Sequence, residues 1–215
     1  MMRSRFDEQL ALLNKELIEM GSLCEDIIAL VSKALADGDK AIAAKVAPVD
    51  AEIDRKERTI ESLCLKLMLQ QQPVARDLRQ ISAALKIITD MERIGDQAAD
   101  IAEIITFIDR RIAEDDDLLQ NMAKATIRMV TESVDAYVGR DINLAQTMVA
   151  HDDVVDDYFD KIKQALIERI ANNPADGGYA IDLLMIAKYF ERIGDHAVNI
   201  AEWVIFSVTG VHKEE

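Results

Sequence analysis

The sequence predicts an all-α protein made of two tandem, similar three-helix bundles, with six long helices and an internal repeat. Three observations support this prediction. Good helix formers such as Ala, Leu, Met, Glu and Lys dominate the 215 residues, while glycine and proline number only 8 and 3. Apolar residues recur at three- and four-residue intervals, with no strand-like alternation of useful length. An acidic five-residue motif occurs twice, about 100 residues apart.

The first three helices are expected over residues 5–36, 39–72 and 73–112. Asp37, Gly38 and Asp39 should end the first helix and start the second, because glycine suits a helix C-terminus and aspartate an N-cap. A kink is expected at Pro48 in the second helix, and Pro73 should open the third.

The charged run at 113–117 is the predicted boundary between a first domain over 1–113 and a second over 114–215. The fourth, fifth and sixth helices are expected over 118–137, 141–171 and 179–208. Gly139, Arg140 and Asp141 repeat the helix end and cap seen at 37–39, and the segment 172–178 has the composition of a turn.

Two pairs of segments define the internal repeat. The sequence ERIGD at 92–96 returns at 191–195, an offset of 99, and the acids of 50–54 correspond to those of 152–156, an offset of 102. The difference falls between the motifs, where a loop can absorb it. Helices one to three therefore form one unit and helices four to six the other.

Each ERIGD motif places two carboxylates on one face of a helix. Glu92 and Asp96 are four residues apart, so their β-carbons lie about 5–6 Å from each other. The apolar residues that follow fall on the opposite face, so these acids are expected to point outward. Like charges at this spacing, and Gly95 inside a helix, both reduce stability. Because the second copy repeats both features, we expect them to have a use.

The spacing of the acids motivates a metal-binding hypothesis. If the second helix of each repeat packs beside the third, each repeat gathers four carboxylates, which suit Mg²⁺, Mn²⁺, iron or, less ideally, Zn²⁺. The predicted ligands are Asp50, Asp54, Glu92 and Asp96 in the first repeat and Asp152, Asp156, Glu191 and Asp195 in the second. The alternative is a solvated acidic face, usual in helical proteins, with its spacing preserved by repeat ancestry alone.

The histidines and cysteines add little to this hypothesis. His151 adjoins the second acidic pair and is a candidate extra ligand, whereas His196 is expected to be exposed or hydrogen-bonded. Cys24 and Cys64 lie in apolar-periodic segments and are expected to be core residues in a reducing cytosol.

Charge and motif content exclude several classes of function. With 25 basic and 40 acidic residues the net charge is −15, which disfavours nucleic acid and fits a basic partner or cations. There is no phosphate-binding loop, nucleophile elbow or inward Glu-x-x-His pair, so we expect no enzyme. Without an apolar run of membrane-spanning length or a signal peptide, a cytoplasmic location without membrane insertion is expected.

The chain resembles the PhoU family over roughly residues 5–210, on the segments QQPVARDLR (71–79), ERIGDQAADIAE (92–103) and ERIGDHAVNIAE (191–202). The second repeat departs from the first of these segments, with NNPADGGYA in its place. The resemblance implies two three-helix bundles, often as a homodimer. It also implies multinuclear iron or zinc clusters on the surface, held by the eight acids named above.

The same resemblance implies a negative regulator of the phosphate regulon. Such a protein would couple the ATPase of a phosphate ABC transporter to a membrane sensor histidine kinase, and would lie at the inner face of the membrane through these partners. Two alternatives stay open: an accessory protein of another phosphate transporter, and a metal-buffering helical protein, because the bundle alone does not separate them.

Overall fold

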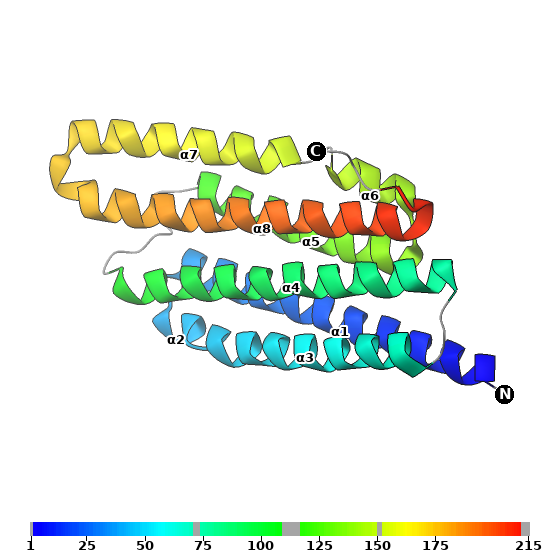
Figure 1. Ribbon diagram of the computed structural model, residues 1–215. Coiled ribbons are helices and arrows are strands. Elements are labelled where there is room, and N and C mark those ends of the chain that lie inside the picture. The colour runs from blue at the N-terminus through cyan, green and yellow to red at the C-terminus, as the bar shows by residue number, and fades with distance from the viewer. Residues whose placement is uncertain (1, 71–73, 109–116, 150–151, 212–215) are drawn as a thin grey trace.

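The computed structural model describes residues 2–70, 74–108, 117–149 and 152–211, and within these ranges the chain is helical apart from short turns (Figure 1). The elements in chain order are α1 (Met2–Asp37), α2 (Lys40–Ala43), α3 (Val46–Gln70), α4 (Ala75–Phe107), α5 (Asp117–Gly139), α6 (Ile142–Val149), α7 (Asp152–Asn172), the 3-10 turn η2 (Pro174–Asp176) and α8 (Gly177–Thr209). The predicted all-α class is therefore confirmed. The predicted domain boundary at 113/114 lies outside the described residues.

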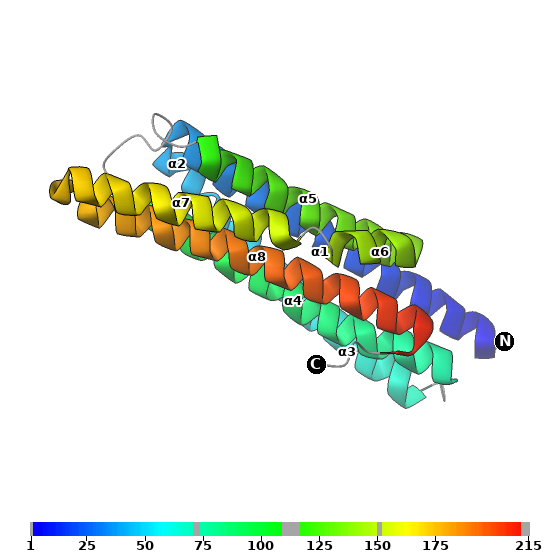
Figure 2. The ribbon, with the colours of Figure 1, turned by 90° about the horizontal axis from the view of Figure 1, so that it is seen from above.

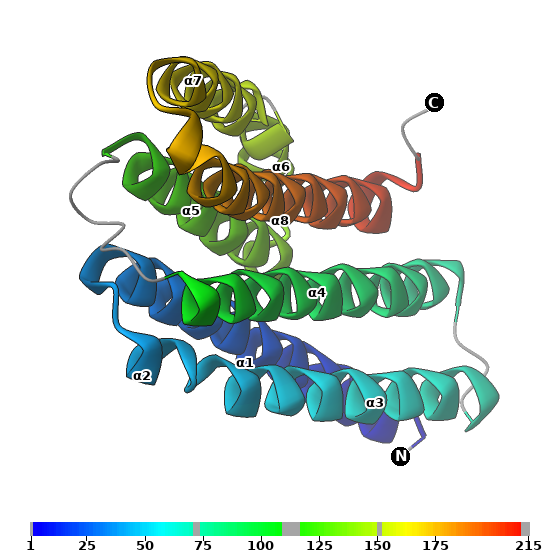
Figure 3. The same ribbon diagram turned by 90° about the vertical axis from the view of Figure 1, so that its left-hand side faces the viewer.

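The helices form two layers with the same arrangement (Figure 3). In one layer α1, α3 and α4 pack against each other, and in the other α5, α7 and α8 do so. The layers meet where α4 lies antiparallel beside α8 and where α1 packs on α5 (Figures 1 and 2). This arrangement is the pair of tandem three-helix bundles that the repeat predicts.

Two of the expected long helices are each divided in the structure. The second breaks into α2 and α3 at Ala44 and Lys45, so the break precedes Pro48, where the kink was expected. Pro48 instead lies in the first turn of α3, where its missing N–H costs no helical hydrogen bond. The fifth is divided in the same way, since α6 ends at Val149 and α7 begins at Asp152.

The two predicted helix ends differ in backbone detail. After α1, Gly38 takes the left-handed conformation with φ 61°, and Asp39 Oδ1 accepts a hydrogen bond from Ala41 N at 2.8 Å, as predicted. After α5, Asp141 caps α6 in the expected way, but Gly139 remains helical and Arg140 carries the positive φ of 49°. Arginine in this conformation costs about 1–2 kcal/mol, which the surrounding contacts must offset.

The core consists of the apolar faces that the periodicity predicted. Ile94, Ala98 and Ile101 of α4 are fully buried, as are Ile193, Ala197 and Ile200 of α8. Cys24 and Cys64 are also buried, and burial raises the pKa of the Cys64 thiol to about 12, so both residues behave as core side chains. Within the described residues, no helix is long and apolar enough to cross a bilayer.

The two layers also approach each other closely where α1 packs on α5. A β-carbon added to Gly21 would lie 2.7 Å from Cγ1 and 2.9 Å from Cγ2 of Val134. Glycine at this position therefore allows the two helices to approach each other. By contrast, a β-carbon added to Gly178 on α8 would meet no atom within 4 Å.

We predict that Gly21→Ala lowers the free energy of unfolding by up to about 2 kcal/mol, because overpacking costs about 1–3 kcal/mol and the gain in helix propensity is about 1 kcal/mol. The control Gly178→Ala should be neutral or slightly stabilising. Urea denaturation of both variants measures the difference. Equal stability of the two would contradict a close approach of α1 and α5.

Candidate functional site

The first predicted set of carboxylates comes together where α3 packs beside α4. Burial raises the pKa of Asp50, and the charges of Asp54, Asp96 and Asp100 raise it further, which places acids of both helices near one another. We call these groups the first acidic cluster; its members are Asp50, Asp54, Glu57, Glu92, Asp96 and Asp100. The predicted gathering of acids from the two helices is therefore present in the first repeat.

The acids of this cluster are partly buried between the helices, although we expected them to point outward. The side chains of Glu92, Asp96 and Asp54 are 20%, 37% and 39% exposed. Asp50 Oδ1 is buried and accepts no hydrogen bond. Water therefore screens these charges incompletely, which makes their proximity costly.

Gly95 of the ERIGD motif makes room for Asp50. A β-carbon added to Gly95 would lie 2.9 Å from Asp50 Oδ1 and 3.2 Å from Ile53 Cδ1. In the second copy, Gly194 has more space, since its added β-carbon would lie 3.5 Å from Val155 Cγ1. Both helix glycines thus accommodate side chains of the neighbouring helix, and Gly95 has a carboxylate against it.

Two arginines offset part of the charge of the first acidic cluster: Arg58, whose Nη1 lies 3.8 Å from Asp54 Oδ2, and Arg93. Arg93 Nη1 donates to Asp96 Oδ2 at 2.8 Å, and its Nε lies 3.4 Å from Glu92 Oε2. Burial is the largest cause of the raised pKa of Glu92, followed by the charge of Asp96, while Arg93 lowers it. Burial also raises the pKa of Glu57, as do the charges of Glu61 and Asp54. A bound cation would favour the ionised form of all these acids.

The second acidic cluster lies between α7 and α8 and comprises Asp153, Asp156, Glu191 and Asp195. Burial and then the charge of Glu191 raise the pKa of both Asp156 and Asp195. Three of the four predicted ligands of this repeat, Asp156, Glu191 and Asp195, are therefore neighbours. Asp152 begins α7, but its side chain lies outside the described part of the structure.

The two clusters differ in charge. Lys188 Nζ donates to Glu191 Oε2 and lowers the pKa of Asp156 and Asp195, whereas Thr89 occupies the corresponding position in the first repeat. Conversely, Glu57 of the first cluster corresponds to Phe159. Arg58 Nη1, however, lies 3.8 Å from Asp54 Oδ2 in the first repeat, where Asp160 stands in the second, so the two clusters differ in which positions carry charge. Sequence reasoning missed both Glu57 and Lys188, although each lies one helical turn from a predicted ligand.

His196 does not join the second cluster but lies between the two repeats. Its Nδ1 is 2.9 Å from Asp90 Oδ1, and Asn199 Nδ2 donates to the same oxygen at 3.2 Å. The expectation of a hydrogen-bonded His196 is confirmed. Asn199 stands where the first repeat has Asp100, and its amide can donate to Asp90 where a carboxylate would repel it. His151 lies outside the described residues.

The acidic clusters fit a hard cation by chemistry more than by preformed geometry. Within the ranges described, no three acidic, histidine or cysteine side chains are grouped closely enough to hold a metal ion as they stand. The donors are nevertheless carboxylate oxygens that repel one another, and Asp50 Oδ1 has no partner. Rotation of partly exposed side chains toward an ion would satisfy these oxygens and complete an oxygen-rich shell with water.

Asp50 provides a test of this repulsion by pH. Its pKa is higher in the folded protein than in the unfolded chain, so the folded state holds the proton more tightly, and stability falls as pH rises through and above the ordinary carboxyl range. We therefore predict that Asp50→Asn stabilises the metal-free protein near neutral pH, and that this gain shrinks as the pH is lowered through that range.

Urea denaturation in the presence of a chelator, at a series of pH values, measures the effect. The matched control is Glu52→Gln, which removes a charge from an exposed position of α3 and should change stability little at any pH. A pH-independent gain, or a loss of stability for Asp50→Asn near neutral pH, would contradict a repulsive cluster.

Comparison with known proteins places the chain in a family. A family model described as the PhoU domain matches twice, over residues 17–105 and 119–204. A Clostridium acetobutylicum protein named phosphate-specific transport system accessory protein PhoU homolog is 35% identical, with 98% of this chain and 97% of that protein covered. A Rhizobium meliloti protein of the same name is 32% identical, with 98% and 90% covered.

Solved structures agree with the sequence relatives. The crystal structure of PhoU from Pseudomonas aeruginosa superimposes with a TM-score of 0.89 at 31% identity, and the match covers 96% of this chain and all of that one, 100%. The twofold match of the domain model coincides with the two layers of helices. This chain, with its two acidic clusters on one repeated framework, belongs to the PhoU domain family.

Proposed function

We propose that this chain is an accessory protein of a phosphate-specific transport system that regulates phosphate uptake and signalling by contact with other proteins. The observation that carries the proposal is similarity along nearly the whole chain to proteins that bear this name. An accessory name also favours a non-catalytic role. Each of the two repeated units offers an acidic cluster as a binding surface, and the sequence contains no phosphate-binding loop, nucleophile elbow or Glu-x-x-His pair.

The partners we propose are the ATPase of a phosphate ABC transporter and the cytoplasmic part of a sensor histidine kinase. Contact with both would bring the chain to the inner face of the membrane and allow it to act as a negative regulator of the phosphate regulon. The net charge of −15 supports a basic partner surface, since complementary charge accelerates encounter and selects partners.

We further propose that both acidic clusters bind metal cations. Supporting features are the carboxylates brought together from two helices, their mutual repulsion and the unpartnered oxygen of Asp50. Asp50, Asp54, Glu92 and Asp96 would hold the ion in the first cluster, with Asp152, Asp156, Glu191 and Asp195 in the second. Iron or zinc is the proposed metal, with manganese or magnesium as the alternatives.

A homodimer is the proposed assembly. Leu65 and Leu69 share one face near the end of α3 and are 49% and 86% exposed, which supports an apolar contact there. Multi-angle light scattering of the tag-free protein tests the assembly. A monomer at micromolar concentration would contradict it.

Metal content tests the cation sites. Elemental mass spectrometry of tag-free protein is expected to find bound metal. Glu92→Ala/Asp96→Ala and Glu191→Ala/Asp195→Ala should each lose part of this metal, because each double substitution removes two proposed ligands of one cluster. The combined four-site variant should be empty while still folded by circular dichroism. Wild-type protein without metal, even after incubation with Mn²⁺ or Fe²⁺, would sink the proposal for both clusters.

Partner binding tests the regulatory role independently of metal. Purified chain should retain the transporter ATPase, the kinase cytoplasmic domain or both in a pull-down, with binding weakened by salt because the surfaces are complementary in charge. Failure to bind either protein, with metal and without it, would contradict a role by contact. If the protein binds partners yet contains no metal, only the proposal of cation sites is rejected.

A further inference from the structure

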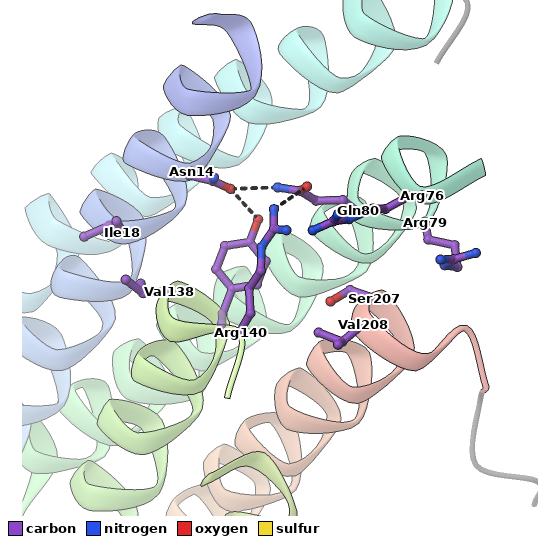
Figure 4. Close-up of a pocket in the computed structure, with 10 residues that line it drawn as sticks. Asn14, Ile18, Arg76, Arg79, Gln80, Val138, Arg140, Ser207 and Val208 are labelled. Atoms are coloured by element: carbon purple, nitrogen blue, oxygen red, sulfur yellow. Dashed lines mark hydrogen bonds between the residues drawn. The ribbon is translucent and has the colours of Figure 1, made fainter. Parts of the chain in front are cut away.

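A pocket of about 350 Å³ lies where the repeats meet, between α1, the start of α4 and the ends of α5 and α8 (Figure 4). Arg79 in its wall lies thirteen residues before Glu92 on α4, about 20 Å along the helix from the first acidic cluster. Among the residues that the structure describes, three arginines and no acidic side chain line the pocket. The lining residues that matter here are Asn14, Arg76, Arg79, Gln80, Tyr137 and Arg140.

Hydrogen bonds fix the polar wall of this arginine pocket (Figure 4). Asn14 Oδ1 accepts from Gln80 Nε2 and from Tyr137 Oη, both at 3.1 Å. Gln80 Oε1 in turn accepts from Arg140 Nη2 at 2.6 Å. Gln80 and Tyr137 are buried, so the chain of bonds from three helices holds the guanidinium of Arg140 in place.

The guanidinium groups of the arginine pocket have no counter-charge. Within the described residues, none of Arg76, Arg79 and Arg140 lies within ion-pair distance of a carboxylate, and Arg79 Nε is buried without a hydrogen-bond partner. The nearby Asp77 accepts instead from the N–H of Val74 at the start of α4, at 3.4 Å. Three uncompensated cations around one pocket are unusual in a chain with a net charge of −15.

The internal repeat shows that these arginines belong to one end of the molecule only. Each has a small, uncharged counterpart in the other repeat, by the offsets of 99 and 102 established above. At the ERIGD offset of 99 the counterparts of Arg76 and Arg79 are Ala175 and Gly178, and at the offset of 102 that of Arg140 is Gly38. Framework packing alone therefore does not demand arginine at these positions. Arg140 even adopts a left-handed backbone that its glycine counterpart adopts without steric cost.

We propose that the arginine pocket binds the phosphate group of a small anion, with inorganic phosphate as the simplest ligand. Guanidinium groups match the oxygens of a tetrahedral anion through paired N–H donors, and the anion supplies the counter-charge that these arginines lack. Arg76 and Arg140 are exposed, so an anion in solution can reach them. Arg79 is half-buried, and its Nε–H is a donor without a partner. The pocket is separate from the acidic clusters and does not depend on cations bridging to phosphate.

Isothermal titration calorimetry of inorganic phosphate into metal-free, full-length protein tests the proposal at constant ionic strength. We expect one saturable site per chain. Arg79→Gln should weaken binding at least about tenfold, since hydrogen bonds to charged groups contribute that much or more. Arg140→Gly should do the same while keeping the backbone conformation, because glycine tolerates positive φ.

The matched control is Lys33→Gln, which removes one exposed positive charge about 28 Å along α1 from Asn14 and should bind phosphate as the wild type does. Pyrophosphate and AMP are titrated in parallel. Tighter binding of either, lost in the arginine variants, supports the pocket and identifies a larger phosphate compound as its ligand.

Three outcomes would overturn the proposal. The first is that the metal-free wild type fails to bind phosphate, pyrophosphate or AMP at millimolar concentration. The second is that the Arg79→Gln and Arg140→Gly variants, both folded, bind phosphate as the wild type does. The third is binding that occurs only after Mn²⁺ is added and disappears in the Glu92→Ala/Asp96→Ala variant, which would assign the phosphate to the first acidic cluster.

Discussion

The antiparallel packing of α4 on α8 is the contact on which the rest of the molecule depends. Each of these helices packs on its own bundle through one apolar face and on the other bundle through a second face. The ERIGD carboxylates of α4 lie beside α3, and those of α8 lie beside α7. Complete burial of a side chain such as Ile94 or Ile193 contributes about 1.5–3 kcal/mol, so this core can offset local costs elsewhere. The bond from His196 to Asp90 adds a polar contact that fixes the register of the two repeats.

Those local costs are concentrated at the positions for which we propose ligands. The first acidic cluster combines like charges, partial burial and an unpartnered oxygen of Asp50, and the arginine pocket combines three unpaired cations with a left-handed Arg140. The first acidic cluster and the arginine pocket therefore lie apart, at separate points along α4, although close approach of their opposite charges would neutralise both. This separation suits a protein that binds cations at one place and an anion at another.

The repeat and the helical periodicity predict the class and arrangement of the fold because both depend on local pattern. The break at Ala44 and Lys45 escapes prediction, since neither residue disfavours a helix and tertiary packing decides it. The acids on α3 and α4 follow from spacing, but their partial burial depends on how closely the helices pack around Gly95. Two arginines of the pocket, Arg76 and Arg79, lie in the segment 71–79 that the sequence singled out, but Asn14, Tyr137 and Arg140 come from distant segments, so the sequence alone does not indicate the pocket.

The most direct test of cation binding is the anomalous difference map of a crystal of this protein grown with Mn²⁺. Binding by the acidic clusters predicts one peak between α3 and α4, bordered by Asp50, Asp54, Glu92 and Asp96, and another between α7 and α8. Peaks confined to lattice contacts or other surfaces, with these carboxylates arranged as in the metal-free state, would contradict it and leave the acids as a charged face for a basic partner.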